Sequence, residues 1–252
     1  MDDNIAVVAE WIRHADNIVA FTGAGISTPS GIPDFRSEDS GLWENVDPQE
    51  VASIYGFRKN PKAFFDWVRP LTQATLDALP NPAHYALVKL EEMGKLRAVI
   101  TQNIDMLHTK AGTQSIFELH GHMRTATCIN CFKSYDGQPI ITQLLNDATI
   151  PHCSECHGVL KPDVILFGEQ LPYEQMRGAK KAAQAADLML IIGSSLEVAP
   201  ASDIPLIAKR NGAKLVIINL EPTIMDRFAD KVIIGDAADL LPEIMTCLNK
   251  VL

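Results

Sequence analysis

Short, almost wholly apolar runs recur along the chain and alternate with segments of helical spacing, and this alternation constrains the fold most. Glycine or polar residues follow most of these runs at once. Buried strands that alternate with helices are typical of a parallel sheet covered on both faces. The expected strands are residues 18–21, 98–101, 116–119, 164–167, 188–192, 215–218 and 232–234. The expected helices are residues 5–15, 61–79, 83–93, 173–186, 201–211 and 237–249.

The size and charge of the chain narrow its class. Its 252 residues suffice for one large α/β domain with a smaller appended module, and 47% hydrophobic with 21% charged residues indicate a globular protein. A formal net charge of −9 argues against direct nucleic-acid binding, which needs a clustered basic face. No apolar run reaches 18 residues, and residues 1–4 are acidic where a secretory signal is basic. We therefore expect a cytoplasmic protein.

Four cysteines form two Cys-x2-Cys pairs, Cys128 with Cys131 and Cys153 with Cys156, separated by 21 residues. Each pair brings two thiolates to one ion, and two pairs complete the tetrahedron that zinc favours. Four thiolates leave no open position for water, so the pattern predicts one structural Zn²⁺ ion. The alternative is four unconnected core cysteines. The fifth cysteine, Cys247, lies at helical spacing from apolar residues and is expected in the core.

The strand 18–21 runs into Gly23-Ala24-Gly25, which is typical of a phosphate-binding turn. Thr28 stands where a dinucleotide fingerprint has its third glycine, so a plain strand-to-helix turn remains the alternative. Polar or glycine-rich residues also follow the strands that end near residues 101, 192 and 218. Ligands bind at the carboxyl ends of parallel strands, so these four strand ends are expected to converge on one crevice.

Several segments together resemble the sirtuin family of NAD-dependent protein deacylases, of the prokaryotic type. They follow the family's order and span nearly the whole chain. The matching segments are Gly23-Ala24-Gly25-Ile26-Ser27, residues 31–36, residues 101–108, His120-Gly121, the four cysteines, Phe167-Gly168-Glu169 and residues 193–196. The resemblance implies a large doubly wound, Rossmann-like sheet domain with a smaller zinc-binding and helical lobe.

The resemblance also implies that NAD is consumed as a co-substrate. Asp105 is then placed to accept hydrogen bonds from the nicotinamide carboxamide, although capping of the helix that follows is an alternative. Glu221 is placed to hold ribose hydroxyls. The implied NAD-binding residues are Gly23, Ala24, Thr28, Asp34, Phe35, Arg36, Gln102, Asn103, Ile104, Asp105, His120, Gly193, Ser194, Ser195, Asn219, Glu221, Asp236 and Ala237.

His120 and Asn103 are the implied catalytic residues. The family reaction begins when the acyl-lysine oxygen attacks the nicotinamide ribose and nicotinamide leaves. His120, whose reference pKa is near neutral, then accepts a proton from a ribose hydroxyl. The products are free lysine and O-acetyl-ADP-ribose.

The implied partner is an acetyl-lysine-containing protein segment, which adds as a strand between two exposed edges. The residues implied to bind it are Val164, Phe167, Gly168, Glu169 and Val198. Core packing is the alternative role for Val164 and Phe167. Some prokaryotic sirtuins bind acidic acyl groups with a tyrosine and an arginine, but Val68 and Leu71 align there. We therefore expect acetyl or apolar acyl groups.

We expect the NAD-binding domain to comprise residues 1–37, 90–121 and 163–252. Residues 38–89 are expected to form a helical module and residues 122–162 the zinc-binding module. Three other functions are alternatives. A protein ADP-ribosyltransferase cleaves NAD in the same way, a dehydrogenase is disfavoured by the missing third glycine, and a non-enzymatic zinc-ribbon module is disfavoured by the net charge.

Overall fold

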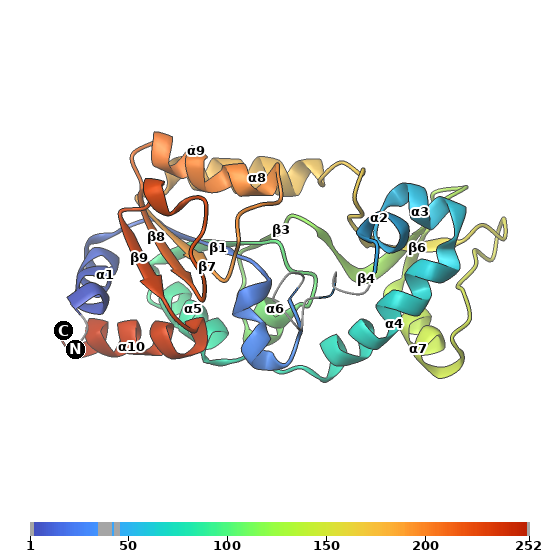
Figure 1. Cartoon of the computed structure of the whole chain (residues 1–252), viewed down its shortest axis with the longest axis horizontal. Coiled ribbons are helices and arrows are strands. Elements are labelled where there is room, and N and C mark those ends of the chain that lie inside the picture. The colour runs from blue at the N-terminus through green and yellow to red at the C-terminus, as the bar shows by residue number, and fades with distance from the viewer. Residues whose placement is uncertain (1–2, 35–41, 43–45, 251–252) are drawn as a thin grey trace. The chain divides into compact units, whose positions relative to one another are not determined.

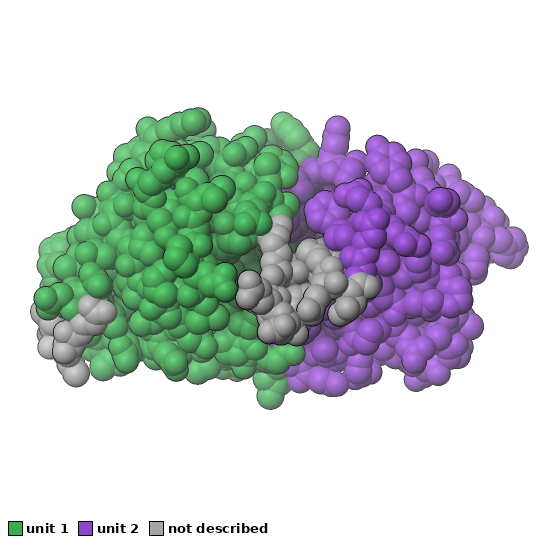
Figure 2. Space-filling view, viewed as in Figure 1, with its two compact units in different colours: residues 1–31, 79–119, 173–252 green, residues 32–78, 120–172 purple. Residues whose placement is uncertain are grey.

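The structure is a computed structural model, and it describes residues 3–34, 42 and 46–250. Two units can be distinguished, each built from separate stretches of the chain (Figure 2). Unit 1 comprises residues 1–31, 79–119 and 173–252, and unit 2 comprises residues 32–78 and 120–172. Of the predicted site residues, Phe35 and Arg36 lie outside the described residues.

Unit 1 is built on a six-stranded sheet in which every neighbouring pair is parallel. In spatial order its strands are β3 (Ile116–Glu118), β2 (Leu96–Thr101), β1 (Ile18–Thr22), β7 (Leu188–Ile192), β8 (Lys214–Asn219) and β9 (Lys231–Ile234). The strand order reverses between β1 and β7, and ligands of such sheets bind at the carboxyl ends of the strands beside this reversal.

Helices cover both faces of the sheet (Figure 1). On one face α1 (Asp3–His14) and α5 (Pro82–Glu92) each pack against α10 (Ala237–Lys250), and on the other α8 (Tyr173–Ala185) packs against α9 (Ile204–Arg210). In α1 the buried residues Ile5, Val8, Ala9 and Ile12 recur at helical spacing and join the core with strands β1, β2, β7 and β8. The predicted doubly wound parallel sheet is therefore confirmed.

Short helices follow four of the strands, β1, β2, β7 and β8. Two 3-10 turns, η1 (Ala24–Ile26) and η2 (Thr28–Ser30), come after β1, and α6 (Leu107–Ala111) follows the loop after β2. Two further 3-10 turns are η3 (Ala201–Asp203), which leads directly into α9, and η4 (Asp226–Phe228). These segments place polar residues at the carboxyl edge of the sheet.

Unit 2 contains a three-stranded antiparallel sheet of β5 (Ser134–Asp136), β4 (Gly121–Cys128) and β6 (Leu160–Val164). Its helices are α2 (Pro48–Val51), α3 (Ile54–Lys59), α4 (Pro61–Asp77) and α7 (Gly137–Asp147). Phe57, Phe64 and Phe65 pack edge to face, with ring centroids 5.2 to 5.9 Å apart, and join α3 to α4. A second core, of Ala126, Cys128, Cys153 and Leu160, lies beside the strands.

Two expectations from the sequence differ from this arrangement. The run 164–167 was expected to form a parallel strand, but the strand is β6, Leu160–Val164, and it pairs antiparallel with β4. Helix α5 was divided between two predicted modules, whereas its buried residues Ala83, Leu87 and Leu90 belong to the core of unit 1. In both places an apolar pattern identified a buried segment without identifying its partner.

Within the described ranges, no helix is both long and apolar enough to cross a membrane.

Candidate active site and metal centre

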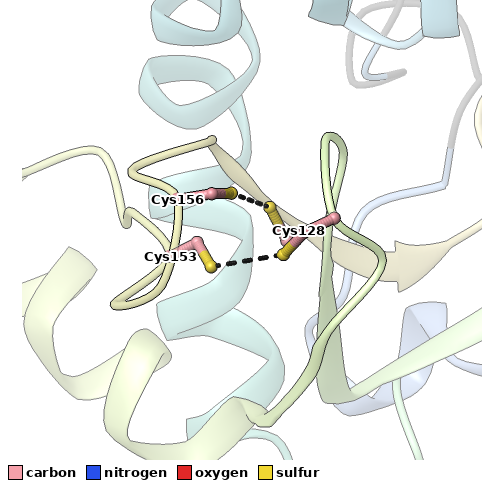
Figure 3. A group of neighbouring side chains, drawn as sticks. Cys128, Cys153 and Cys156 are labelled. Carbon is pink, nitrogen blue, oxygen red and sulfur yellow. Dashed lines mark hydrogen bonds between the residues drawn. The ribbon is translucent and has the colours of Figure 1, made fainter.

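The four predicted zinc ligands come together in unit 2, where their sulfur atoms all lie within 4.8 Å of one another. Cys128 Sγ is 3.5 Å from Cys156 Sγ, and Cys131 Sγ is 3.6 Å from Cys153 Sγ (Figure 3). These separations are too long for disulfides, but they approach the ~3.8 Å between sulfurs around a tetrahedral zinc ion with bonds of about 2.3 Å. The donor set and its spacing fit one zinc ion.

Neighbouring groups lower the thiol pKa of Cys128 and Cys153 and so favour the thiolate form that binds zinc, whereas the neighbouring sulfurs raise the pKa of Cys131 and Cys156. The Tyr135 hydroxyl lies 3.0 Å from Cys153 Sγ, and this hydrogen bond lowers the pKa of the Cys153 thiol to about 6. The backbone N–H groups of Asn130 and Glu155 point at Cys128 Sγ (3.5 Å) and Cys153 Sγ (3.4 Å). Such donors stabilise negative charge on the sulfurs of Cys128 and Cys153, and this favours the binding of a cation.

At the strand reversal, the loops after β1 and β7 meet backbone against backbone. Gly25 N–H donates to Gly193 O at 2.8 Å, and a Cβ on Gly23 would lie 2.7 Å from the same oxygen. Gly193 itself has φ +60°, and a Cβ there would lie 2.2 Å from Ile26 N. Only glycines allow this approach, which explains the Gly23-Ala24-Gly25 and Gly193-Ser194-Ser195 segments in physical terms.

Hydrogen bonds connect this junction to the loop after β2. Gln102 Nε2 donates to Ser194 Oγ at 2.9 Å. Asn103 Nδ2 donates to Gly23 O at 3.0 Å and to Ser27 Oγ at 3.2 Å, and its backbone N–H donates to Thr101 Oγ at 3.1 Å. The predicted residues after β1, β2 and β7 are thus brought together.

Asp105 is a buried carboxylate in this loop. Its Oδ2 accepts from Ser27 Oγ at 2.7 Å and its Oδ1 from Leu107 N at 2.8 Å. Burial raises the pKa of Asp105, and these hydrogen bonds act in the opposite direction. Asp105 therefore binds the first N–H of α6, one residue before the N-cap residue Met106, and it also lines a cavity of about 10 Å³ with Asn103 and Met106.

The remaining cofactor candidates of unit 1 lie near the same edge of the sheet. Thr28 Oγ donates to Gly25 O at 3.1 Å. Asn219, at the end of β8, donates from Nδ2 to Glu221 O at 2.8 Å, and its carbonyl accepts from Gly235 N at 2.9 Å. Asp236 Oδ1 accepts from Ala238 N at 2.8 Å and so caps α10, which begins at Ala237.

Several predicted residues lie in unit 2. His120 is half-buried, and its carbonyl accepts from Ile165 N at 2.9 Å, which joins β4 to the segment after β6. The following Gly121 has φ +74°, and a Cβ there would meet Asp163 O at 2.0 Å, so the His-Gly pair requires its glycine. Asp34 is half-buried, and its carbonyl accepts from Leu42 N at 3.0 Å.

The peptide candidates differ in exposure. Val164 is buried, whereas Phe167 is 37% exposed and its backbone forms a short bridge to α2 and α3 through Ala52 O (2.9 Å) and Ile54 N (3.0 Å). Gly168 packs against the ring of Tyr55, and a Cβ there would lie 2.9 Å from the ring. Val198, in unit 1, is half-buried.

Asn81 is a residue that the sequence analysis missed. Its Nδ2 donates to Ile26 O at 2.7 Å and to Ser30 Oγ at 3.0 Å, so it holds the turns after β1 in place. Its Oδ1 accepts from Ala83 N at 3.0 Å and begins α5. The Asn-Pro dipeptide signals a helix start, but nothing in it indicates the loop that Asn81 supports.

The comparisons with known proteins agree with this geometry. A Sir2 family model matches residues 23–200. An NAD-dependent protein deacylase 2 of Archaeoglobus fulgidus is 48% identical over 246 residues, which cover 97% of this chain and 96% of that protein. An NAD-dependent protein deacetylase of Sulfolobus acidocaldarius is 49% identical over 239 residues, which cover 95% and 93%.

Solved structures match equally well. The structure reported as the structural basis for the mechanism and regulation of Sir2 enzymes has a TM-score of 0.95, with 46% identity and full coverage of both chains. A Sir2 structure with a p53 peptide and NAD⁺ has a TM-score of 0.87 at 39% identity, covering 95% of this chain and 96% of that one. The resemblance inferred from the sequence is therefore confirmed, and the chain belongs to the Sir2, or sirtuin, family.

Proposed function

We propose that this protein is an NAD-dependent protein-lysine deacetylase that releases nicotinamide, free lysine and O-acetyl-ADP-ribose. The observation that carries the proposal is the junction of the loops after β1, β2 and β7 at the strand reversal, where Gly25, Asn103 and Ser194 belong to one hydrogen-bonded group. Both curated relatives described above carry names of NAD-dependent deacylases or deacetylases.

Residues of unit 1 bind NAD in this proposal. The backbone of the loops that begin at Gly23 and Gly193 approaches the phosphates. Asn103 and Asp105 surround the nicotinamide and its ribose, and Glu221 with Asn219 hold the second ribose. NAD supplies an activated glycosidic bond, and the protein positions and shields it.

His120 acts as the general base in this proposal. It follows the buried residue Leu119, which comes directly after β3, and Gly121 and Ile165 fix its backbone. An imidazole held in position can accept the ribose hydroxyl proton as a general base. Asn103 assists by holding the loop that faces the nicotinamide ribose.

The acetyl-lysine segment binds along residues 164–169 and near Val198 in this proposal. Backbone hydrogen bonds of an added strand give affinity with little sequence specificity. A related structure, Sir2Af2, holds a myristoylated histone peptide, with a TM-score of 0.85 and 40% identity over 100% of this chain and 98% of that one. That relative accepts an apolar acyl chain.

We further propose that acidic acyl groups are poor substrates. Val68 is buried within α4 and Leu71 is half-buried, so neither position offers a cation or hydroxyl to a carboxylate. A neutral acetyl group needs no such partner.

The four cysteines hold a structural zinc ion and keep strands β4 and β6 joined to the loop between them. Their reduced thiols suit a reducing compartment, and we propose a cytoplasmic location. We also propose that the protein binds no nucleic acid directly, because its net charge is −9.

The test is incubation of the purified protein with NAD and an acetyl-lysine peptide, with all products followed by mass spectrometry. Nicotinamide release that requires the peptide, with equal amounts of free lysine and O-acetyl-ADP-ribose, supports the proposal. His120→Ala is expected to abolish these products. Nicotinamide release without deacetylation, or ADP-ribose attached to protein, would instead indicate NAD hydrolysis or ADP-ribosyl transfer.

A further inference from the structure

Two buried histidines face each other beneath the loop after β2. His84, on α5, is 0% exposed, and His108, on α6, is 3% exposed. Their ring centroids are 4.9 Å apart, with an angle of 59° between the rings. Burial lowers the pKa of His84 to about 4, and burial together with the neighbouring His84 lowers the pKa of His108 to about 3. Both rings are therefore neutral at physiological pH.

The hydrogen bonds fix which nitrogen of each ring carries the proton. Asn81 N–H donates to His84 Nδ1 at 3.3 Å, so the proton of His84 is on Nε2. His108 Nε2 lies 2.9 Å from Thr22 Oγ, whose own proton is donated to Thr101 Oγ at 2.9 Å. His108 Nε2 must therefore be the donor, which leaves His108 Nδ1 as an acceptor.

The two remaining nitrogens are complementary. Within the described part of the chain, His84 Nε2 and His108 Nδ1 are buried without a hydrogen-bond partner. The tautomers above make the first a donor and the second an acceptor, on adjacent rings. Buried polar atoms are rarely left unpaired, and we infer a single bridging water that accepts from His84 Nε2 and donates to His108 Nδ1.

With this bridge the hydrogen bonds close a ring around the base of the proposed NAD site. Asn81 holds Ile26 and Ser30 in the turns after β1. Asn81 N–H donates to His84, and on the other side of the inferred water His108 is bonded to Thr22, which donates to Thr101.

The ring is completed by the loop after β2. Thr101 Oγ accepts from Asn103 N–H, and Asn103 Nδ2 returns to Gly23 O and Ser27 Oγ. Every member belongs to unit 1.

We propose that His84 and His108 are positioning residues that fix the loop of residues 102–105 against the turns after β1, and so set the affinity for the nicotinamide end of NAD. This inference rests on the proposed function. His84 and His108 are neutral imidazoles and take no part in proton transfer to or from substrate, so their role is to hold the loop in place.

The test compares His108→Leu with His108→Gln. The leucine side chain removes both ring nitrogens, whereas the glutamine amide can still donate to Thr22. His108→Leu is expected to raise the KM for NAD and the inhibition constant of nicotinamide about tenfold, as befits one lost buried hydrogen bond, and to leave the KM for acetyl-peptide unchanged. His108→Gln is expected to restore most of the affinity. The matched control is His14→Leu, since that ring is 72% exposed on α1.

Thr22→Val provides a second route if His108→Leu fails to fold. On its own, Thr22→Val should raise the KM for NAD about tenfold and leave the KM for acetyl-peptide unchanged, because it breaks the same hydrogen bond. Where both variants fold, Thr22→Val and His108→Leu should be strongly non-additive in the KM for NAD. Additive effects would overturn the inference, and so would equal increases in the KM for NAD and for peptide. Equal loss in His108→Gln and His108→Leu would also overturn it.

A spectroscopic measurement separates this inference from the proposed function. In ¹⁵N spectra of the histidine rings, both His84 and His108 should remain neutral with the proton on Nε2 between about pH 5.5 and 8. Titration of either ring in that range would refute the ring of hydrogen bonds, even in a fully active deacetylase. If the wild-type protein does not deacetylate the peptide but its ¹⁵N spectra are as expected, only the proposed function is refuted.

Discussion

Lys161 and Glu169 form an ion pair inside unit 2, with 3.1 Å between Lys161 Nζ and Glu169 Oε2. The same Nζ donates to the carbonyls of Pro162 (3.0 Å) and Val164 (2.8 Å), and Lys161 is only 9% exposed. One cation thus contacts both ends of residues 162–169, which include the segment 164–169 proposed to bind the acetylated peptide. The carboxylate of Glu169 is engaged within the protein, so its proposed role in peptide binding is to shape this segment.

Lys161→Met is expected to raise the KM for an acetyl-lysine peptide and to leave the KM for NAD unchanged. The substitution keeps the aliphatic volume but leaves Glu169 without its cation, a loss of about 1–3 kcal/mol for a largely buried pair. Steady-state kinetics with each substrate varied in turn and a melting curve measure both effects. The matched control is Lys62→Met, because Lys62 is 69% exposed beside Asp66 and such pairs contribute little. An unchanged peptide KM in Lys161→Met would contradict the role of the ion pair.

The sequence predicts the sheet of unit 1 well because each strand can be recognised from its own run of apolar residues. The runs that became β1 and β7 are buried along their whole length, and only a strand between two helical layers has that pattern. The cysteine pairs are similarly predictable, since their spacing alone limits their geometry. Both inferences hold without any knowledge of which segments are neighbours.

The parts of the fold and of the site that the sequence does not predict depend on contacts between residues far apart in the chain. Thr22 and His108 are 86 positions apart, and nothing around either residue indicates that they share a hydrogen bond. The run 164–167 is apolar like the central strands, but Phe167 is partly exposed and its partner is α2 and α3 rather than the parallel sheet. A hydrophobic pattern reports burial, whereas the identity of the partner is set by tertiary packing.

Removal of zinc is expected to loosen unit 2 and abolish deacetylation. Cys128 and Cys153 are core residues beside Ala126 and Leu160, so loss of the ion leaves buried thiolates without a cation. Metal analysis should find one zinc per chain, and a strong chelator should lower the melting temperature and the activity together. Cys128→Ser is expected to lose the metal, whereas Cys247→Ala should keep it because Cys247 lies in the core of unit 1. Full activity in metal-free protein would contradict this prediction.

Gly25→Ala is expected to weaken NAD binding about tenfold or more, a loss of at least ~1.4 kcal/mol. The new Cβ would lie 2.9 Å from Gly193 Cα, so the loops after β1 and β7 must separate. Calorimetric titration with NAD measures the effect directly. Gly94→Ala is the control, since no atom lies within 4 Å of its Cβ, and its φ of +69° costs only about 1–2 kcal/mol of stability. Equal affinity for NAD in both variants would contradict the close approach as the reason for the glycine.

Asp105→Asn is expected to stabilise the protein near pH 7.5 while it raises the KM for NAD. Burial raises the pKa of Asp105, so the native state holds a proton that the unfolded state has released, and wild-type stability falls as the pH rises through that window. Asparagine removes the cost of the buried charge, about 1–2 kcal/mol, and its amide still satisfies Leu107 N–H and Ser27 Oγ.

The pH dependence is the diagnostic measurement for Asp105. The difference in melting temperature between Asp105→Asn and wild type should shrink as the pH falls toward 3.8, the ordinary pKa of an aspartate, below which the carboxyl is protonated in both the folded and the unfolded state. Asp147→Asn is the control of opposite sign, because the Thr149 hydroxyl lowers the pKa of Asp147 and its charged form stabilises the protein. A gain in Asp105→Asn that does not depend on pH would show that charge burial is not its cause.

Acetyl-lysine peptides are expected to react at least about tenfold faster in kcat/KM than succinyl-lysine peptides of the same sequence. A succinyl carboxylate must lose its hydration on entering an apolar site, and without a partner this costs more than ~1.4 kcal/mol. Val68 is 5% exposed on α4 and cannot supply that partner, and Leu71 has no polar atom in its side chain. A butyryl-lysine peptide is the matched control because it has the same chain length without the charge, and it should react at a rate closer to acetyl than to succinyl. Faster turnover of succinyl-lysine than of acetyl-lysine would show that another cation, outside these two positions, recognises the acyl group.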